Sequence, residues 1–467
     1  MAGIGFRLQK LLSSESYTDL IKAYLFSSII ATGPMLVVMA TLILVKGSIE
    51  SRLSIEEGRL FLSLIVYVYA FSMVGVGPFL YVVTRYLADK HYLKQTDAYT
   101  PTYFSTIEII FAFQGITALI FLIPLPLSWS LKWVIVVFYL LVSGTWMAMV
   151  ILSAARNYNW ILIAFIGGGV IGWLASIYFG KEMGLGGFLN GYTLGQAVTF
   201  TILTARIMIE FGFERTHDYG FLFYYKKYPL MAIIGVAYYL GTWIDKFVFW
   251  FFNKDVLPGE IFRVYPTYDT PMFLAFLTIV PSMAFFLVEM ETSFAKEFHA
   301  YYESIKNRDS LGQIREYENS IRNNVSRHFQ KFALFQGLFS TLIITFITQI
   351  ADVFHLNPYQ LGILRIGILG AFLQMGFVMI LNIFFYFDFQ KEALVLTLIY
   401  AAGNALFAFI TLRIGLPAYG FGYAVTCFIT VLLGFFLLDS RLKSLNYWTF
   451  MKQPIVTPKF KFETEGN

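Results

Sequence analysis

The residues best placed to do chemistry are two adjacent charges, Asp245 and Lys246, inside the long apolar stretch 230–252. A helix of that length crosses a bilayer, and each charge costs about 2.5–3.5 kcal/mol at the centre of such a span. Intramembrane charges commonly mark a pathway. Since neighbouring residues point about 100° apart on a helix, we expect each charge to find its partner on another span. The structural alternative is that Lys246 reaches the outer interface while Asp245 is a satisfied buried group.

Two further charges belong to this pattern. Arg365 is expected at the same depth as Asp245, in the outer half of the membrane, so the sequence predicts an ion pair between them. Glu108 is expected near the cytoplasmic face, where Arg85 is the candidate partner. The candidate residues of a substrate pathway are therefore Asp245, Lys246, Arg365 and Glu108.

Aromatic side chains accompany Asp245. Tyr238, Tyr239 and Trp243 lie deep in the same stretch, while Trp250 and Tyr265 fit an interfacial belt. Aromatic faces pack on apolar surfaces, among them the C–H faces of sugars. We therefore predict that Tyr238, Tyr239 and Trp243 line the pathway as well.

The elements that must position these residues are membrane spans. The chain is 58% hydrophobic and only 13% charged, with a mean hydropathy of +0.66, against about 25% charged residues in soluble proteins. This composition predicts an all-α polytopic membrane protein. Twelve apolar spans are expected, at 21–45, 60–84, 103–126, 131–153, 158–180, 188–210, 228–252, 269–291, 331–352, 359–386, 391–413 and 418–440.

Loop charges predict the orientation. With the N-terminus inside, twenty-four lysines and arginines fall in cytoplasmic segments and eight in outer ones, which predicts that both termini are cytoplasmic. Residues 1–20 resemble an interfacial helix, and 441–467 form a tail. A cytoplasmic linker, 211–227, separates six-helix bundles at 21–210 and 228–440. Two such halves suggest a transporter whose site lies between them.

Prolines predict irregular helices within three spans. Gly33-Pro34, Gly77-Pro78 and Pro281 each interrupt an apolar run, and proline removes a backbone donor and kinks a helix. Broken helices often line transport cavities, so these positions are candidate gates. Glycine and proline are also common in ordinary membrane helices.

The cytoplasmic loop 292–330 has the pattern of two amphipathic helices. Their apolar faces are candidates for docking a cytosolic partner, and packing on the protein's own inner surface is the alternative. The residues concerned are Phe294, Phe298, Ile305, Ile314, Ile321 and Val325.

The sequence shows no catalytic constellation. There is no phosphate-binding GxxxxGK[ST] motif, the five histidines are scattered, and Cys427 is the single cysteine. We therefore expect no enzymatic activity, no metal and no cofactor. The net charge of +5 is accounted for by cytoplasmic loops facing membrane lipids, and predicts no nucleic-acid partner.

The opening MAGIGF, the basic-leucine segment after it, Tyr24 and Gly33-Pro34 resemble the PelG family of bacterial exopolysaccharide exporters. The resemblance implies a flippase-like member of the multidrug/oligosaccharidyl-lipid/polysaccharide (MOP) superfamily, with a V-shaped pair of six-helix bundles. It further implies export of a galactosamine-rich polysaccharide across the bacterial inner membrane. The implied partners are a cytosolic glycosyltransferase and membrane-bound regulatory or scaffold subunits.

Two other functional classes remain open at this stage. A cation-coupled multidrug or lipid-linked oligosaccharide antiporter would need a carboxylate in its cavity, and Asp245 and Glu108 are the candidates. A membrane scaffold that holds a glycosyltransferase without transporting anything would need neither.

Overall fold

The computed structural model describes residues 17–154, 158–213, 217–254 and 261–451. Most of the predicted interfacial helix at 1–20 and residues 452–467 of the predicted tail lie outside this part of the chain. Every regular element within it is helical. The elements are α2 (Tyr17–Glu50), α3 (Ile55–Tyr92), η1 (Thr96–Ala98), α4 (Tyr99–Leu122), α5 (Trp129–Ala154), α6 (Tyr158–Phe211), α7 (Phe221–Lys227), α8 (Pro229–Phe252), α9 (Pro266–Leu277), α10 (Val280–Glu289), the π-helical η2 (Met290–Phe294), α11 (Ala295–Lys306), α12 (Leu311–Thr345), α13 (Ile347–Val353), α14 (Pro358–Tyr386), α15 (Gln390–Ile414), η3 (Leu416–Ala418), α16 (Phe421–Leu442) and α17 (Leu445–Met451).

The predicted spans are recovered as helices. Among the described residues, ten helices are long and apolar enough to cross a membrane, and α12 with α13, bent by 62°, makes an eleventh. The twelfth comes from α6, which is counted once. As one straight helix its 54 residues would be about 80 Å long, far more than one crossing of a bilayer needs. The predicted twelve-span, all-helical fold is therefore confirmed.

Helix α6 is a hairpin of two spans. At Gly184 the backbone takes φ 57° and ψ −136°, a conformation that glycine tolerates, and the chain reverses. The arms then pack closely, since a Cβ added at Gly195 would lie 2.4 Å from the carbonyl oxygen of Gly168. Ser176 donates a hydrogen bond across the hairpin to the Phe188 carbonyl, at 3.0 Å. The glycines of this region are thus packing residues.

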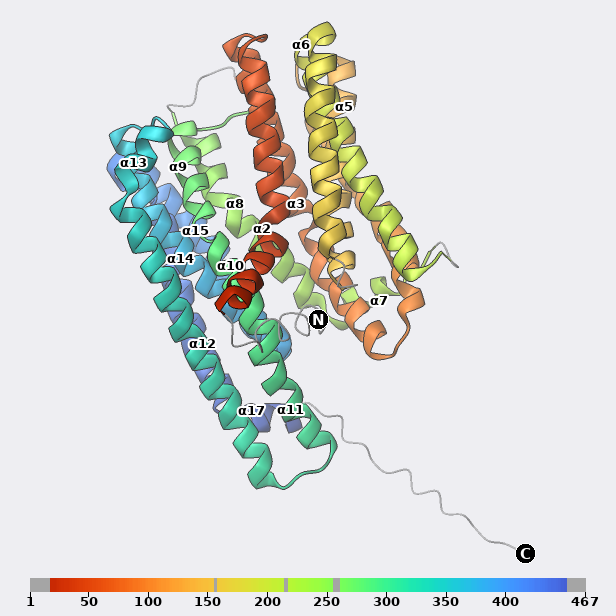
Figure 1. Ribbon diagram of the computed structural model, residues 1–467, viewed down its shortest axis with the longest axis vertical. Helices are drawn as coiled ribbons and strands as arrows, with labels where there is room; N and C mark the ends of the chain where they lie inside the picture. The colour runs from red at the N-terminus through yellow and green to blue at the C-terminus, as the bar shows by residue number, and fades with distance from the viewer. Residues whose placement is uncertain (1–16, 155–157, 214–216, 255–260, 452–467) are drawn as a thin grey trace, which may run out of the picture.

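The helices form two bundles, which Figure 1 shows side by side. One contains α2 to α6, in red to yellow, and the other contains α8 to α16, in green to blue. Between the bundles, α2 contacts α10 and α3 contacts α8. Helices α11 and α12 project beyond the second bundle as a long hairpin, and we call that end of the molecule the hairpin side.

The predicted proline breaks have different outcomes. Helices α2 and α3 continue through Pro34 and Pro78, because neighbouring turns keep their own hydrogen bonds when one donor is lost. The span that contains Pro281 is divided between α9 and α10. At this break the Gln336 amide, fully buried on α12, donates to the Thr278 carbonyl at 3.1 Å.

The two helices predicted at 292–330 are present, but their apolar faces are not available to a partner. Phe294 and Ile321 are fully buried, and Ile314 and Val325 nearly so, while Phe298 and Ile305 are partly buried against the same core. The prediction that these six residues form a free docking surface is wrong. The faces pack against each other and the second bundle, which removes more apolar area from water than either helix does alone.

Polar contacts hold this hairpin in register. Along α10 to α11, Glu289, Ser293 and Glu297 lie four residues apart and meet residues four apart on α12. Their partners are His328 at 2.7 Å, Asn324 at 3.1 Å and Ser320 at 2.7 Å. The hairpin is therefore a fixed extension of the second bundle.

Candidate functional site

The two bundles come into close backbone contact at two glycines, Gly77 on α3 and Gly235 on α8. A Cβ added at Gly235 would lie 2.1 Å from the Gly77 carbonyl oxygen, and one added at Gly77 would lie 2.9 Å from the Gly235 oxygen. No side chain fits at this crossing. It forms the centre of the α3–α8 interface, the surface on which the two halves of the predicted transporter meet.

Aromatic rings close the α3–α8 interface on the side opposite the hairpin. Tyr67 stacks on Trp250 with 5.0 Å between ring centroids, and Phe71 stacks on Phe247 at 4.8 Å. The Tyr67 hydroxyl also donates to the Arg263 carbonyl at 2.9 Å. Stacked pairs contribute beyond their buried area, so this end of the interface is held together well.

Beside the two glycines, Tyr239 of α8 reaches the facing bundle. Its ring lies 6.4 Å from that of Tyr81 on α3, and Tyr81 in turn packs at 4.8 Å against Phe385 of α14. The Tyr225 hydroxyl, on the linker helix α7, donates to the Pro78 carbonyl at 3.3 Å. The structure thus places one predicted pathway residue, Tyr239, directly between the bundles, next to a predicted kink.

Tyr238 and Trp243 lie in different surroundings on α8. Tyr238 is partly buried and packs 6.2 Å from Phe377 of its own bundle. Trp243 is also partly buried, and the Lys246 ammonium lies 5.7 Å from its ring centroid. A cation held over an aromatic face is stabilised by the ring quadrupole.

Asp245 and Lys246 pair with each other. The ammonium lies 3.1 Å from the carboxylate, and the two side chains are 10% and 0% exposed, respectively. Tyr268 of α9 donates a further hydrogen bond to Asp245 at 2.8 Å. The expectation that each charge finds its partner on another span is therefore wrong for Lys246. The alternative that Lys246 reaches the outer interface is wrong as well. A lysine stem is flexible enough to turn back along its own helix.

Arg365 takes no part in this cluster. Its side chain is exposed, and no ion pair within 4 Å joins it to Asp245. The predicted Asp245–Arg365 pair is therefore wrong, although both residues lie on spans of one bundle. Matching depth was the basis of that prediction, and depth does not fix the direction in which a side chain leaves its helix.

Glu108 and Arg85 also have other partners. The Glu108 side chain is 60% exposed, accepts a hydrogen bond from the Tyr219 hydroxyl at 2.6 Å and lies 3.6 Å from His217. This bond raises the pKa of Tyr219, because the phenol donates to a carboxylate. Arg85 lies instead 3.5 Å from Asp89. The predicted Arg85–Glu108 neutralisation does not occur.

The carboxylate of Asp269, a partly buried residue, is not among the predicted site residues. Asp269, in the first turn of α9, accepts from the Trp250 indole at 2.7 Å and from the Tyr265 amide at 2.9 Å. Its other carboxylate oxygen is buried, with no hydrogen-bond partner among the described residues. Its position three residues into a proline-led helix is a local signal, but its burial arises only when α8 packs beside it.

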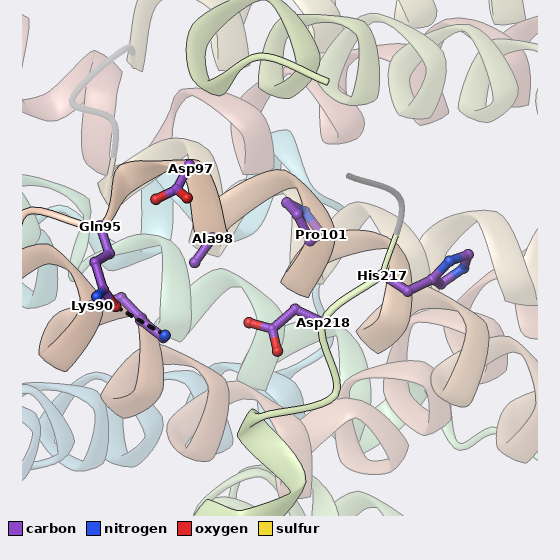
Figure 2. A pocket seen from close by; sticks show the side chains of 7 residues that line it. All are labelled: Lys90, Gln95, Asp97, Ala98, Pro101, His217 and Asp218. Carbon is purple, nitrogen blue, oxygen red and sulfur yellow. Dashed lines mark hydrogen bonds between the residues drawn. The ribbon is translucent and has the colours of Figure 1, made fainter. Parts of the chain in front are cut away.

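A separate pocket of about 300 Å³ lies at the linker between the bundles, and Figure 2 shows its lining. Lys90 donates to Gln95 at 3.0 Å, and Asp218 accepts from the Tyr86 hydroxyl at 2.5 Å. The pocket contains none of the predicted pathway residues, and the partners of Asp218 and His217, Tyr86 and Glu108, lie outside its lining. Among the described residues, no group of three or more histidine, cysteine, aspartate or glutamate side chains is arranged to hold a metal ion.

Comparison with solved structures places the fold. A MATE family multidrug resistance transporter of the MOP superfamily in an outward-facing conformation matches with a TM-score of 0.64 and 16% identity, over 91% of this chain and 96% of that one. A MOP superfamily transporter from Pyrococcus furiosus matches with a TM-score of 0.61 and 14% identity, over 91% and 96%. An inward-facing MATE transporter gives 0.59 and 13%, over 90% and 99%. At these identities the likeness establishes the fold.

Comparison by sequence establishes the family. No curated protein matches the chain. The family model described as "PelG: Putative exopolysaccharide Exporter (EPS-E)" matches residues 1–450, nearly the whole sequence. The solved structures that share its fold are transporters of the MATE family or the MOP superfamily. On this evidence the chain belongs to the PelG family of exopolysaccharide exporters.

Proposed function

We propose that this protein exports a galactosamine-rich exopolysaccharide across the bacterial inner membrane, with the polymer passing between the two bundles. The single observation that carries the proposal is the α3–α8 interface. There, bare glycine backbone brings the bundles together, and Tyr239 lies only partly buried beside the crossing. Trp243, about two turns further along α8, is partly buried as well. Sugar rings bind such aromatic faces without needing charged ligands.

The state of the predicted carboxylates supports export without coupling to them. Asp245 is neutralised by Lys246 and bonded to Tyr268, so a coupling cation would have to displace an ammonium already in place. Glu108 is exposed and bonded to Tyr219. In this proposal the hairpin side faces the cytoplasm, as the loop charges predict, and elongation by a cytosolic glycosyltransferase drives the polymer outward.

The buried free oxygen of Asp269 favours a second candidate, a proton- or cation-coupled exporter or antiporter. A carboxylate oxygen without a partner is costly in an apolar bundle, and binding a cation or a proton would satisfy it. Asp269, rather than Asp245 or Glu108, is therefore the residue that separates the two mechanisms.

The experiment compares Trp243→Ala and Trp243→Phe in cells that secrete the polymer, measuring polymer outside the cell against protein in the membrane. We expect Trp243→Ala to reduce export while the protein level is kept, and Trp243→Phe to retain most of the export. Equal loss of export and protein in Trp243→Ala would mean that the side chain is only core packing. A variant that exports nothing yet still holds the glycosyltransferase would count against a scaffold.

A further inference from the structure

The linker helix α7 has two unlike faces. Phe221 is fully buried against the first bundle. Tyr224 and Tyr225 also face inward, since Tyr224 donates to Asp89 at 2.8 Å and Tyr225 donates to the Pro78 carbonyl at 3.3 Å. The inward face therefore fixes the helix to α3 at the point where the two bundles meet.

The outward face consists of Leu222, Phe223, Lys226 and Lys227, and we call it the α7 outer face. Phe223 is 64% exposed and Leu222 is 43% exposed. The span α8 begins at Pro229, two residues after α7 ends, so the α7 outer face lies at the depth where a span enters the membrane. At that depth, aromatic and aliphatic side chains beside lysines are the signature of an interfacial helix.

The α7 outer face carries a lysine charge, that of Lys226, which is available for binding. Within the described part of the chain, Lys226 is exposed and forms no ion pair. Lys227 is 47% exposed, but its ammonium already lies 3.9 Å from Asp89 and 5.0 and 4.9 Å from the ring centroids of Tyr224 and Tyr228. Cations at this depth attract anionic headgroups, and each lysine near such a surface increases binding by about fivefold.

We propose that the α7 outer face binds anionic phospholipid of the leaflet on the hairpin side, with Leu222 and Phe223 inserted among the acyl chains and Lys226 bound to a headgroup phosphate. Because Tyr225 on the same helix bonds to Pro78, this lipid contact holds the linker against the α3–α8 interface. The proposal does not depend on which molecule is exported.

Depth is measured first, on the whole protein in lipid nanodiscs. A spin label is attached at Phe223→Cys, and the native Cys427 is fully buried and stays unlabelled. We expect the label to collide more with oxygen, which is concentrated in lipid, than with a water-soluble nickel complex. The control label at Glu303→Cys, exposed on α11, should show the reverse. Nickel preference at position 223 overturns the proposal, and so does shielding from both reagents, which would mean that a protein covers this face.

Headgroup preference is measured next, by native mass spectrometry of protein from nanodiscs of phosphatidylcholine with phosphatidylglycerol. We expect Lys226→Gln to lower the retained phosphatidylglycerol by about fivefold relative to the unsubstituted protein. The matched control, Lys306→Gln, removes the same charge from an exposed position at the tip of the α11–α12 hairpin and should retain it fully. Unchanged retention in Lys226→Gln would refute the proposal, as would equal losses in both variants.

Discussion

Replacing Asp245 by alanine gives the sharpest test of the buried pair. The change removes a carboxylate with no exposed surface, 3.1 Å from an ammonium whose side chain is 10% exposed, and it also removes the acceptor of Tyr268. At an effective dielectric constant of about 20, two unit charges at that distance attract by about 5 kcal/mol. Breaking one side of a buried pair typically costs about 3–5 kcal/mol, because the remaining charge is left uncompensated. We expect Asp245→Ala to lose stability in that range.

The double variant Asp245→Asn with Lys246→Met isolates the pairing. It removes both charges while keeping similar volume, and such replacements are often neutral or stabilising, because no ion then needs to be desolvated. We therefore expect the double variant to be far more stable than the sum of its single variants predicts, with a coupling term of at least about 2 kcal/mol.

The assay is chemical unfolding of the purified protein in mixed micelles, followed by tryptophan fluorescence. Arg365→Ala is the control, because that side chain is exposed and has no ion pair with Asp245, and we expect a change within about 0.5 kcal/mol. Strictly additive losses in the Asp245–Lys246 cycle would refute the reasoning. A loss in Arg365→Ala as large as that in Asp245→Ala would restore the pair that the structure excludes.

Three other outcomes follow from the same contacts. Gly235→Ala places a methyl group 2.1 Å from the Gly77 carbonyl oxygen, so it should lower stability by about 1–3 kcal/mol and reduce export. Chemical unfolding and the amount of secreted polymer measure these two effects, and no change in either would show that the bundles do not meet there. Ile321→Asp puts a charge at a fully buried site, so the amount of membrane-inserted protein in a Western blot should fall sharply. A normal amount of protein with only partner binding lost would restore the docking role of this face. Glu108→Gln keeps an acceptor for Tyr219 on an exposed side chain, so export per unit of protein should be unchanged, and complete loss would favour ion coupling.

The sequence determined the number and position of the spans, because a bilayer requires about 20 apolar residues for each crossing and that requirement is local. It also predicted the two helices at 292–330 and an irregular span at Pro281, since periodicity and proline chemistry act within a few residues. The family resemblance came from the opening motif at 1–6 and the basic-leucine segment after it, together with Tyr24 and Gly33-Pro34, and residues 1–16 are outside the described part of the chain.

Tertiary packing decided which side chains are buried and which partners they contact. Whether the faces of 292–330 were free or buried depended on the position of the second bundle, which no local pattern encodes. The Gly77–Gly235 contact joins residues from different halves, and either glycine alone looks like an ordinary membrane glycine. Glu108 and Arg85 share a membrane face, but their actual partners, Tyr219 and Asp89, depend on side-chain direction.

The Asp245–Lys246 pair shows most clearly which features the sequence determined and which the tertiary structure decided. The sequence established that two charges occupy a membrane span and must be compensated, because an unpaired charge there is too costly. It did not establish the partner, since backbone geometry sets where a side chain starts and rotatable bonds set where its charge ends. Only the packed bundle, in which Tyr268 donates to the same carboxylate and the Lys246 side chain is only 10% exposed, turns Lys246 back onto its neighbour.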